Sequence, residues 1–136
     1  PDEVSAEANG RAFSRLLLAT VERLRALGAR VDIVTSVPEV GFSAPELVAR
    51  HVQLGRPVPT IAREHFERRQ ARSHALIEAA AQRAAARVLH LHPLLCDGQH
   101  CAIARNGRVL YHDDDHLSLE GAREIQQAVG PTVGVS

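Results

Sequence analysis

The sequence of 136 residues contains no lysine, methionine or tryptophan, and aromatic residues make up only 3% of it. Leucine, valine, isoleucine and alanine therefore have to fill the interior, and an aromatic platform for stacking sugars is disfavoured. All sixteen basic residues are arginines, and they balance sixteen acidic residues. The arginines are scattered, so no concentrated basic patch indicates a nucleic-acid partner. A hydrophobic fraction of 45% argues against disorder.

Long hydrophobic runs are also absent. The longest run near the N-terminus, residues 16–19, is followed at once by Thr20. A membrane-spanning helix needs about 18 or more apolar residues, and no signal peptide is visible. The length suits a single domain over residues 1–136. Because the chain begins at Pro1 and lacks methionine, we expect it to be a piece of a longer protein.

The chain has two cysteines, Cys96 and Cys101, in the sequence LCDGQHC. Their spacing does not fit the Cys-x-x-Cys pattern of zinc and redox sites. They are either two unrelated reduced thiols or, as we favour, a tight disulfide that would indicate an oxidising compartment. So short a loop would stabilise the fold by roughly 2–3 kcal/mol at most, so the bond would mainly fix the shape of the loop.

The spacing of apolar residues predicts the secondary structure. Apolar positions at three- and four-residue steps predict one helix over 6–27 and a second from residue 61 or 63 to residue 86. The β-branched residues at 31–37 predict a strand, and residues 87–92 predict another. A helix followed by such a strand is typical of the second half of a βαβ unit.

The remaining segments complete an α/β pattern. Residues 38–62 form a long connection with one short helix, for which Ser43 and Glu46 predict a capping box. The Asn-Gly pair within 105–108 predicts a hairpin, and Ser118 predicts the start of a final helix to about residue 129. We therefore expect an α/β domain whose helices cover a small parallel sheet.

The stretch His112-Asp-Asp-Asp-His116 allows three interpretations from the residues alone. Its side chains could bind a divalent ion, as could His90 and His92 on one face of a strand. It could instead be a solvated acidic turn, which is favourable before a helix N-terminus. In the third, Asp113 accepts a hydrogen bond from the Nδ1–H of His116, which leaves Nε2 available as a general base.

Four sequence features together resemble a known family. Val37-Pro38-Glu39 follows an L-x-x-T-x-x-x-L-x-x-x-G helix over 17–28, and the L-C-x-x-x-x-C loop precedes G-x-x-L-Y-x-D-x-D-H-L-S-x-x-G-A at 107–122. They resemble the C-terminal part of the SGNH domain fused to bacterial membrane-bound acyltransferases of the acyltransferase-3 family. Proteins of that family O-acetylate cell-surface polysaccharides such as lipopolysaccharide O-antigen. The resemblance covers about residues 13–122.

This resemblance implies a three-layer α/β/α, SGNH-hydrolase-like (flavodoxin-like) fold with a parallel sheet, of which the chain is the C-terminal portion. It implies that Asp113 and His116 are catalytic, that Cys96 and Cys101 form a disulfide, and that no cofactor or metal is bound. The Gly-Asp-Ser block with the nucleophile, and the Gly and Asn of the oxyanion hole, are absent from the sequence. We expect them upstream, because Ser118 lies too close to His116 and is better explained as a helix cap.

The implied protein is a membrane O-acyltransferase whose SGNH domain lies at the periplasmic face of the bacterial inner membrane. An acyl donor, a surface polysaccharide acceptor and an upstream membrane acyltransferase domain would be its partners, and the isolated chain would be inactive. A secreted SGNH carbohydrate esterase, a non-catalytic carbohydrate-binding or interaction module, and a metal-binding module remain alternatives. Missing strands would leave an apolar sheet edge through which copies could associate.

Overall fold

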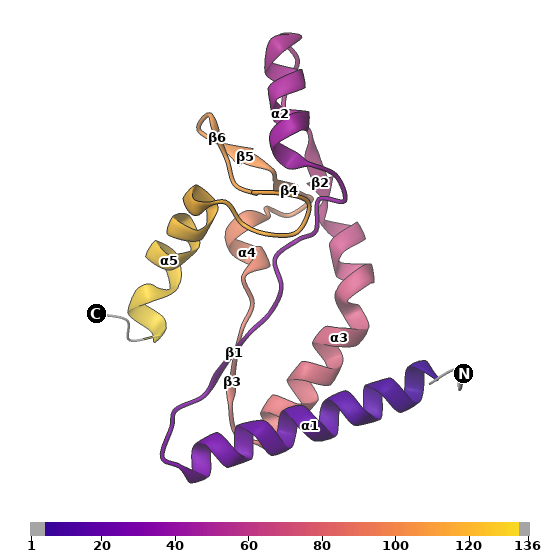
Figure 1. The fold of residues 1–136 in the computed structure, drawn as a ribbon, viewed down its shortest axis with the longest axis vertical. Helices are drawn as coiled ribbons and strands as arrows, with labels where there is room; N and C mark the ends of the chain where they lie inside the picture. Colours follow the sequence, from indigo (N-terminus) through magenta and orange to yellow (C-terminus); the bar gives the residue numbers. More distant parts are fainter. Residues whose placement is uncertain (1–4, 134–136) are drawn as a thin grey trace. The chain divides into compact units, whose positions relative to one another are not determined.

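The computed structural model describes residues 5–133, and Figure 1 shows their course. They divide into two compact units, one formed by residues up to 35 with 70–89, the other by 36–69 with the residues from 90 onward. Helix α3 (Arg63–Arg83) contributes to both units. Within the described residues, none of the helices combines the length and apolar character that a bilayer crossing requires. The expectation of a single domain over 1–136 stays a prediction.

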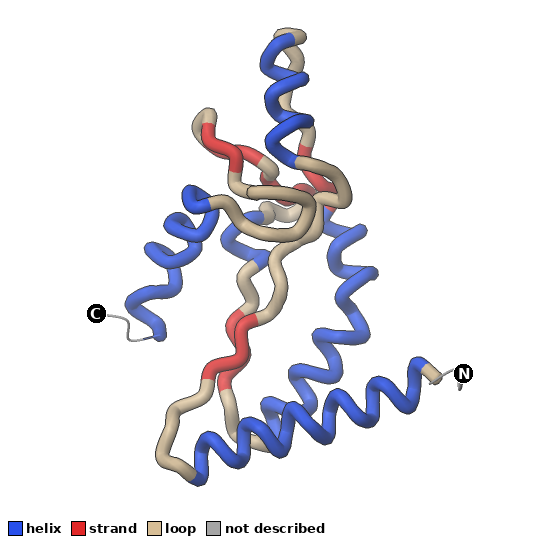
Figure 2. Tube along the Cα trace, in the orientation of Figure 1, coloured by secondary structure: helices blue, strands red, loops and turns tan. Residues whose placement is uncertain are grey.

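The first unit contains a pair of parallel strands, β1 (Asp32–Val34) and β3 (Arg87–Leu89), drawn in red in Figure 2. Asp32 lies opposite Arg87 in the register. The guanidinium of Arg87 donates to both carboxylate oxygens of Asp32, at 2.9 and 2.7 Å. This bidentate contact favours the observed strand register over registers shifted by one or more residues. The two predicted strands are thus present and parallel, but each is shorter than predicted.

Helix α1 (Ala6–Ala26) confirms the first predicted helix. It ends before Gly28, whose φ of 86° is open to glycine but unfavourable for other residues. Val21 is its one buried large apolar side chain among the described residues, while Phe13 and Leu27 are 43% and 73% exposed. The guanidinium of Arg25 fixes the end of the helix by donating to the carbonyl of Ala84 at 3.0 Å.

The strand predicted over 87–92 ends early, at Leu89, and this part of the prediction is wrong. His92 instead begins a one-turn helix, α4 (His92–Leu95). Pro93 explains the difference, because its fixed φ suits the first turn of a helix and it has no N–H to donate to a sheet. His90 and His92 therefore do not share a strand face; their rings meet edge to face with centroids 5.7 Å apart.

The second unit contains two short antiparallel pairs. Strand β2 (Thr60–Ala62) pairs with β4 (His100–Ala102), and β5 (Ala104–Arg105) pairs with β6 (Arg108–Val109). The turn between β5 and β6 has positive φ at Asn106 (52°) and Gly107 (75°), as a two-residue hairpin turn of type I′ requires. The predicted hairpin is confirmed. Strand β2 is missing from the sequence-based expectation, because three residues are too few to show an alternating pattern.

Helix α2 (Ala44–Gln53) begins directly after Ser43, as predicted, but the predicted capping box is wrong. The side chain of Ser43 makes no cap hydrogen bond. Pro45 removes one of the amides at the start of the helix, since proline has no N–H. The amide of Ala44 finds its partner elsewhere, in the carbonyl of Asp113 at 3.3 Å. This hydrogen bond therefore joins the start of α2 to the acidic turn of residues 112–116.

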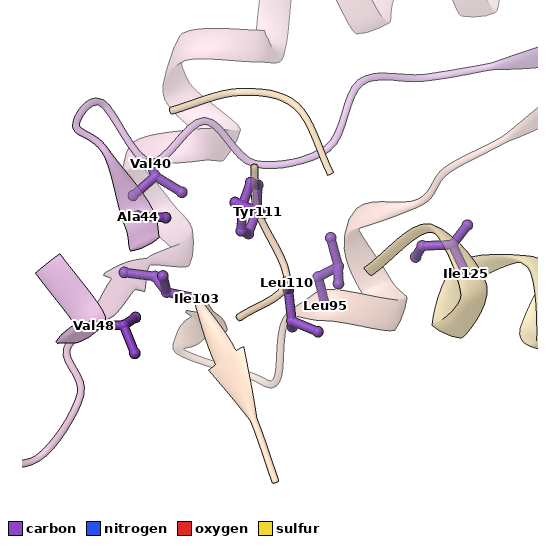
Figure 3. Close-up of a cluster of buried hydrophobic side chains, with 8 residues drawn as sticks. All are labelled: Val40, Ala44, Val48, Leu95, Ile103, Leu110, Tyr111 and Ile125. Atoms are coloured by element: carbon purple, nitrogen blue, oxygen red, sulfur yellow. The ribbon is translucent and has the colours of Figure 1, made fainter. Parts of the chain in front are cut away.

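The core of the second unit collects apolar side chains from α2, α4, the hairpin region and α5 (Leu119–Val133) (Figure 3). Tyr111 and Leu110 are both 1% exposed and come from the chain that leads into the acidic turn. The cluster holds the base of that turn in place, while the turn itself reaches solvent. Its buried members are Val40, Ala44, Val48, Leu95, Ile103, Leu110, Tyr111 and Ile125.

The first turn of α5 lies directly against the backbone of Leu110. The amide of Ser118 donates to the Leu110 carbonyl at 2.9 Å. A Cβ added to Gly121 would lie only 2.1 Å from that carbonyl oxygen. No side chain fits there, so glycine is required by the approach of two backbone segments.

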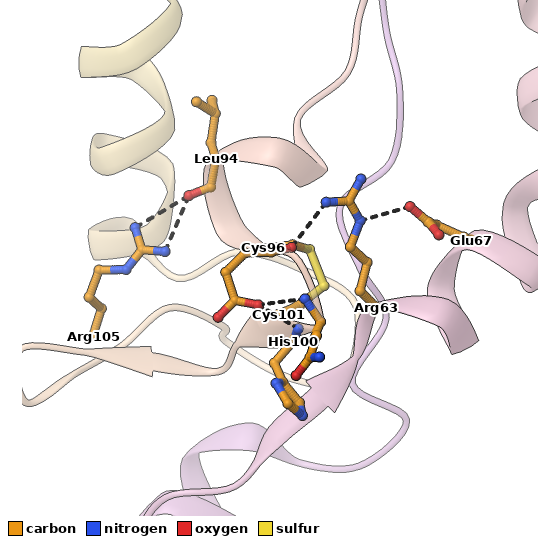
Figure 4. The surroundings of a disulfide bond; sticks show 9 residues. Arg63, Glu67, Leu94, Cys96, His100, Cys101 and Arg105 are labelled. Atoms are coloured by element: carbon orange, nitrogen blue, oxygen red, sulfur yellow. Dashed lines mark hydrogen bonds and ion pairs between the residues drawn. A yellow bond between two sulfur atoms is a disulfide. The ribbon is translucent and has the colours of Figure 1, made fainter.

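The disulfide Cys96–Cys101 encloses the four residues 97–100, which lead from α4 into β4 (Figure 4). Within this loop, the Asp97 carboxylate accepts the amides of Gln99 and His100 at 2.8 and 2.7 Å, and these bonds lower the pKa of Asp97. Arg63 donates to the Asp97 carbonyl at 3.0 Å, which joins the loop to the start of α3. Side-chain bonds and the disulfide together fix the shape of the loop.

We predict that Gly121→Ala destabilises the protein by about 3 kcal/mol, because the new methyl group must push α5 away from Leu110. Gly130→Ala is the matched control in the same helix, since its Cβ would meet nothing within 4 Å. The control should be neutral or stabilise by up to about 1 kcal/mol. Urea denaturation followed by circular dichroism measures both, and equal midpoints for the two variants would contradict the close contact.

We predict that replacing Cys96 and Cys101 together by serine lowers the free energy of unfolding by about 2 kcal/mol, as expected for a short closed loop. Dithiothreitol should lower the stability of the wild type to that of the variant and leave the variant unchanged. A variant as stable as the oxidised wild type would show that the bond contributes nothing to folding.

Candidate functional site

The acidic turn comprises residues 112–116, and its two ends are anchored. Tyr111 and Leu117 face each other in an antiparallel bridge, and the amide of His112 donates to the carbonyl of His116 at 2.8 Å. Tyr111 is buried and Leu117 half-buried, while His112 and His116 are exposed. The turn is therefore a short closed loop on a buried base, and it presents its side chains to solvent.

A second set of backbone bonds ties the turn to the segment before α2. The amide of Val40 donates to the carbonyl of Asp114 at 2.6 Å, and that of Ala44 to the carbonyl of Asp113 at 3.3 Å. Both anchors use peptide groups, so the carboxylates of the turn remain available for other contacts. Sequence reasoning misses these anchors, since backbone donors carry no signature in residue type. The nearby Val-Pro-Glu sequence is the one indication that this segment matters.

The Asp113 carboxylate is held by the backbone of its own turn. Its Oδ1 accepts the amides of His116 at 2.7 Å and Asp115 at 3.0 Å. These two bonds, the His116 amide first, hold the pKa of Asp113 down at about 2, with a smaller contribution from the His116 side chain. Asp113 is thus ionised at neutral pH and fixed in orientation.

The imidazole of His116 lies against this carboxylate. Its Nδ1 is 3.0 Å from Oδ2 of Asp113 and 2.8 Å from Oδ1 of Asp115. The hydrogen bond to Asp113 is the main cause that raises the pKa of His116, followed by the charges of Asp113 and Asp115. A single Nδ1–H forms one strong hydrogen bond. Asp113 is the better-positioned acceptor, because two backbone amides fix the orientation of its carboxylate. A proton on Nδ1 leaves Nε2 as the basic nitrogen of the ring.

The structure thus brings together the two residues predicted to act as a pair, in the orientation that the third interpretation requires. The metal interpretation has a geometric basis too, because ligand atoms of Asp113, Asp115 and His116 lie within 4.8 Å of one another. Three solvent-accessible groups are few for a closed site, and each contact is already explained by the hydrogen bonds and ion pairs of the turn. Within residues 5–133, no such group includes His90 or His92.

Ser118 is a helix cap, as predicted. Its Oγ donates to the carbonyl of Val109 at 2.7 Å and accepts the amide of Gly121 at 3.1 Å. The hydroxyl proton is therefore engaged by the carbonyl of Val109. Ser5 has the same type of role at the start of α1, where its Oγ accepts the amide of Ala8 at 3.2 Å. Over the described part of the chain, none of the hydrogen bonds joins a serine hydroxyl to His116.

Comparison with known proteins agrees with this architecture. The family described as "SGNH domain (fused to AT3 domains)" matches residues 1–131. No protein with a curated description matches the chain significantly. A solved structure, the periplasmic domain of a lipopolysaccharide acetyltransferase from Salmonella ser. Paratyphi A, is similar with a TM-score of 0.70 and 14% identity over 91% of the chain. The match confirms the α/β fold class; the chain spans 50% of that structure's length.

We predict that His116 titrates above its ordinary pKa of 6.5 and that Asp113→Asn moves its midpoint down toward that value. The oxygen of the asparagine side chain can still accept the two turn amides, so the change removes mainly the charge. Asp114→Asn is the control and should shift the midpoint less, because Asp114 is the weakest contributor. Nuclear magnetic resonance titration of the imidazole carbon-bound protons measures all three proteins.

The sign of the effect on stability follows from the raised pKa of His116. Protonation of His116 stabilises the folded state. This contribution is fully present below about pH 6.5 and is lost as the pH rises through the pKa of His116 in the folded protein.

If the titration midpoint of His116 were the same in Asp113→Asn as in the wild type, the Asp113 carboxylate would not act on the imidazole.

Proposed function

Because the chain belongs to the SGNH domains that are fused to AT3 domains, we propose that it supplies the Asp–His half of a Ser-His-Asp acyl-transfer site. The observation that carries this proposal is the contact of His116 Nδ1 with the Asp113 carboxylate at 3.0 Å. A carboxylate fixed by backbone amides orients the ring and stabilises its cationic form, which are the two tasks of the acid in such a triad.

The chemistry would run in two halves. In the first, His116 Nε2 takes the proton of a serine hydroxyl as its oxygen attacks the carbonyl of the acyl donor; an acyl-serine forms, and the donor's leaving group departs with that proton. In the second, His116 deprotonates a sugar hydroxyl, which attacks the acyl-serine. The sugar ester leaves, and the proton returns to the serine. Asp113 stays ionised and stabilises the imidazolium in both halves.

The serine of this scheme is not in the sequence, which contains no Gly-Asp-Ser. We place it in another segment of the complete SGNH domain, of which this chain would be the C-terminal portion. A general base must approach the hydroxyl to about 2.6–3.2 Å, so that segment has to lie over His116 Nε2. The His116 side chain is 74% exposed within the described residues, which leaves room for such an approach.

The physiological setting is part of the proposal. Fusion to AT3 domains supports an upstream membrane acyltransferase domain as partner. A periplasmic location is supported by the Cys96–Cys101 disulfide, which needs an oxidising compartment. The similar Salmonella structure is described as the periplasmic domain of a lipopolysaccharide acetyltransferase, which supports surface polysaccharide such as O-antigen as the acceptor and acetyl as the transferred group.

We predict that the full-length protein hydrolyses p-nitrophenyl acetate slowly and that His116→Ala lowers kcat by about 10³-fold or more. Asp113→Asn should lower it by about 10²–10⁴-fold, because the imidazole loses its orienting anion. His112→Ala is the matched histidine control and should retain the wild-type rate, since the hydrogen bond that His112 makes within the turn comes from its backbone amide.

The 136-residue chain alone should show no hydrolysis above background, because it lacks the Gly-Asp-Ser nucleophile. Rapid hydrolysis by this chain, lost on His116→Ala, would place the nucleophile within it and overturn that part of the proposal. Full activity of the His116→Ala variant of the complete protein would overturn the proposal as a whole.

A further inference from the structure

A cavity of about 480 Å³ lies in the second unit, outside the Asp113–His116 pair. Its walls come from residues 39–41, from Ile61 of β2 and from the first two turns of α3. The volume falls within the range of about 300–1,000 Å³ that is typical of sites for small ligands.

The cavity and the acidic turn are attached to the same segment. Val40 lines the cavity with its neighbours, and its amide donates to the carbonyl of Asp114 at 2.6 Å. A ligand in the cavity would therefore contact the segment that positions the proposed catalytic pair. This attachment makes the cavity a candidate for holding part of a substrate, because substrate-positioning contacts work best on elements fixed to the reacting groups.

The polar groups of the cavity include a carboxylate and a guanidinium in contact. Arg69 Nε lies 2.6 Å from Oε2 of Glu39, and their side chains are 72% and 29% exposed. Arg68, which also lines the cavity, forms an ion pair with Glu64 one turn earlier on α3. Glu39 thus offsets the charge of Arg69 within the lining, and Glu64, beside the cavity, offsets the charge of Arg68. A neutral ligand fits this balance.

Apart from His65, the rest of the lining is apolar. Phe66 and Val40 are 4% and 7% exposed, and Ile61 is half-buried beside them. The ligand must therefore present an apolar face together with neutral groups that both donate and accept hydrogen bonds. A guanidinium donates and a carboxylate accepts, which is the pair of partners that neighbouring hydroxyls require. A sugar ring, with C–H groups on its faces and hydroxyls at its edge, has this combination.

We propose that this cavity binds one neutral glycosyl unit of the acceptor saccharide, with Glu39 and Arg69 as the hydrogen-bonding residues. The proposal rests on the proposed function, which makes a saccharide the acceptor, and adds the place where it is held. Glu39 and Arg69 determine specificity in this scheme, and the acetyl chemistry stays with the acidic turn.

Saturation-transfer nuclear magnetic resonance on the full-length protein tests the site, with the methyl glycosides of glucose, galactose, mannose, rhamnose and N-acetylglucosamine as probes. At least one glycoside should receive saturation, and Arg69→Gln and Glu39→Gln should each weaken its affinity by about tenfold or more. Arg108→Gln is the matched control, because it breaks a surface Arg–Glu pair of 2.8 Å outside the cavity. It should bind as the wild type does.

Absence of saturation for all five glycosides, or equal affinity in Arg69→Gln and wild type, would overturn the proposal. Thermal unfolding of each variant separates lost binding from lost folding. Arg69→Lys is a second, milder change that keeps the positive charge but removes the planar guanidinium.

Saccharide binding needs no nucleophile, so this result is independent of the ester assay. Saccharide binding without His116-dependent hydrolysis overturns the proposed function alone, and the reverse result overturns only the cavity assignment.

Discussion

The carbonyl of Leu110 is the point on which the arrangement of the second unit depends. It accepts the amide of Ser118, and the backbone of Gly121 packs directly against it. These contacts fix where the chain leaves the core and where α5 begins, so the intervening residues have to form a closed turn. The position of His116 relative to Asp113 follows from that closure together with the bond from the His116 amide to the Asp113 carboxylate.

In the acidic turn, backbone groups form the anchoring hydrogen bonds and side chains form the Asp113–His116 contact. Peptide groups of Asp113, Asp114 and His116 serve as anchors to Ala44, Val40 and His112. The carboxylate of Asp113 then completes the turn from inside and remains ionised, which is why it can act on the imidazole. An exposed pair without such anchoring would spend much of its time in other rotamers and would contribute little.

The sequence predicts elements that show a helical period or a turn motif, such as the Asn-Gly hairpin, and misses short elements that show neither. Helices of 21 residues such as α1 have enough turns to show their period, whereas β2 has three residues and no pattern. Pro93 is consistent with the end of a strand and equally suited to beginning a helix, so its residue type alone does not decide between them. The Asp113–His116 contact is predictable because it is local along the chain. The anchors at Val40 and Ala44 join segments that are distant in sequence through backbone groups, and nothing in the residue types reveals them.

The closed geometry of residues 110–121 limits which insertions, deletions and substitutions this segment can accept during evolution. An insertion or deletion between Asp113 and His116 would displace the Asp113 carboxylate from the amides of Asp115 and His116, so substitution of Asp114 is tolerated more readily than a change in length. The spacing of the key residues is therefore as characteristic of this site as their identity. A motif with tyrosine, aspartate, histidine, serine and glycine at the intervals of 111, 113, 116, 118 and 121 would identify the same turn in chains of low overall sequence identity.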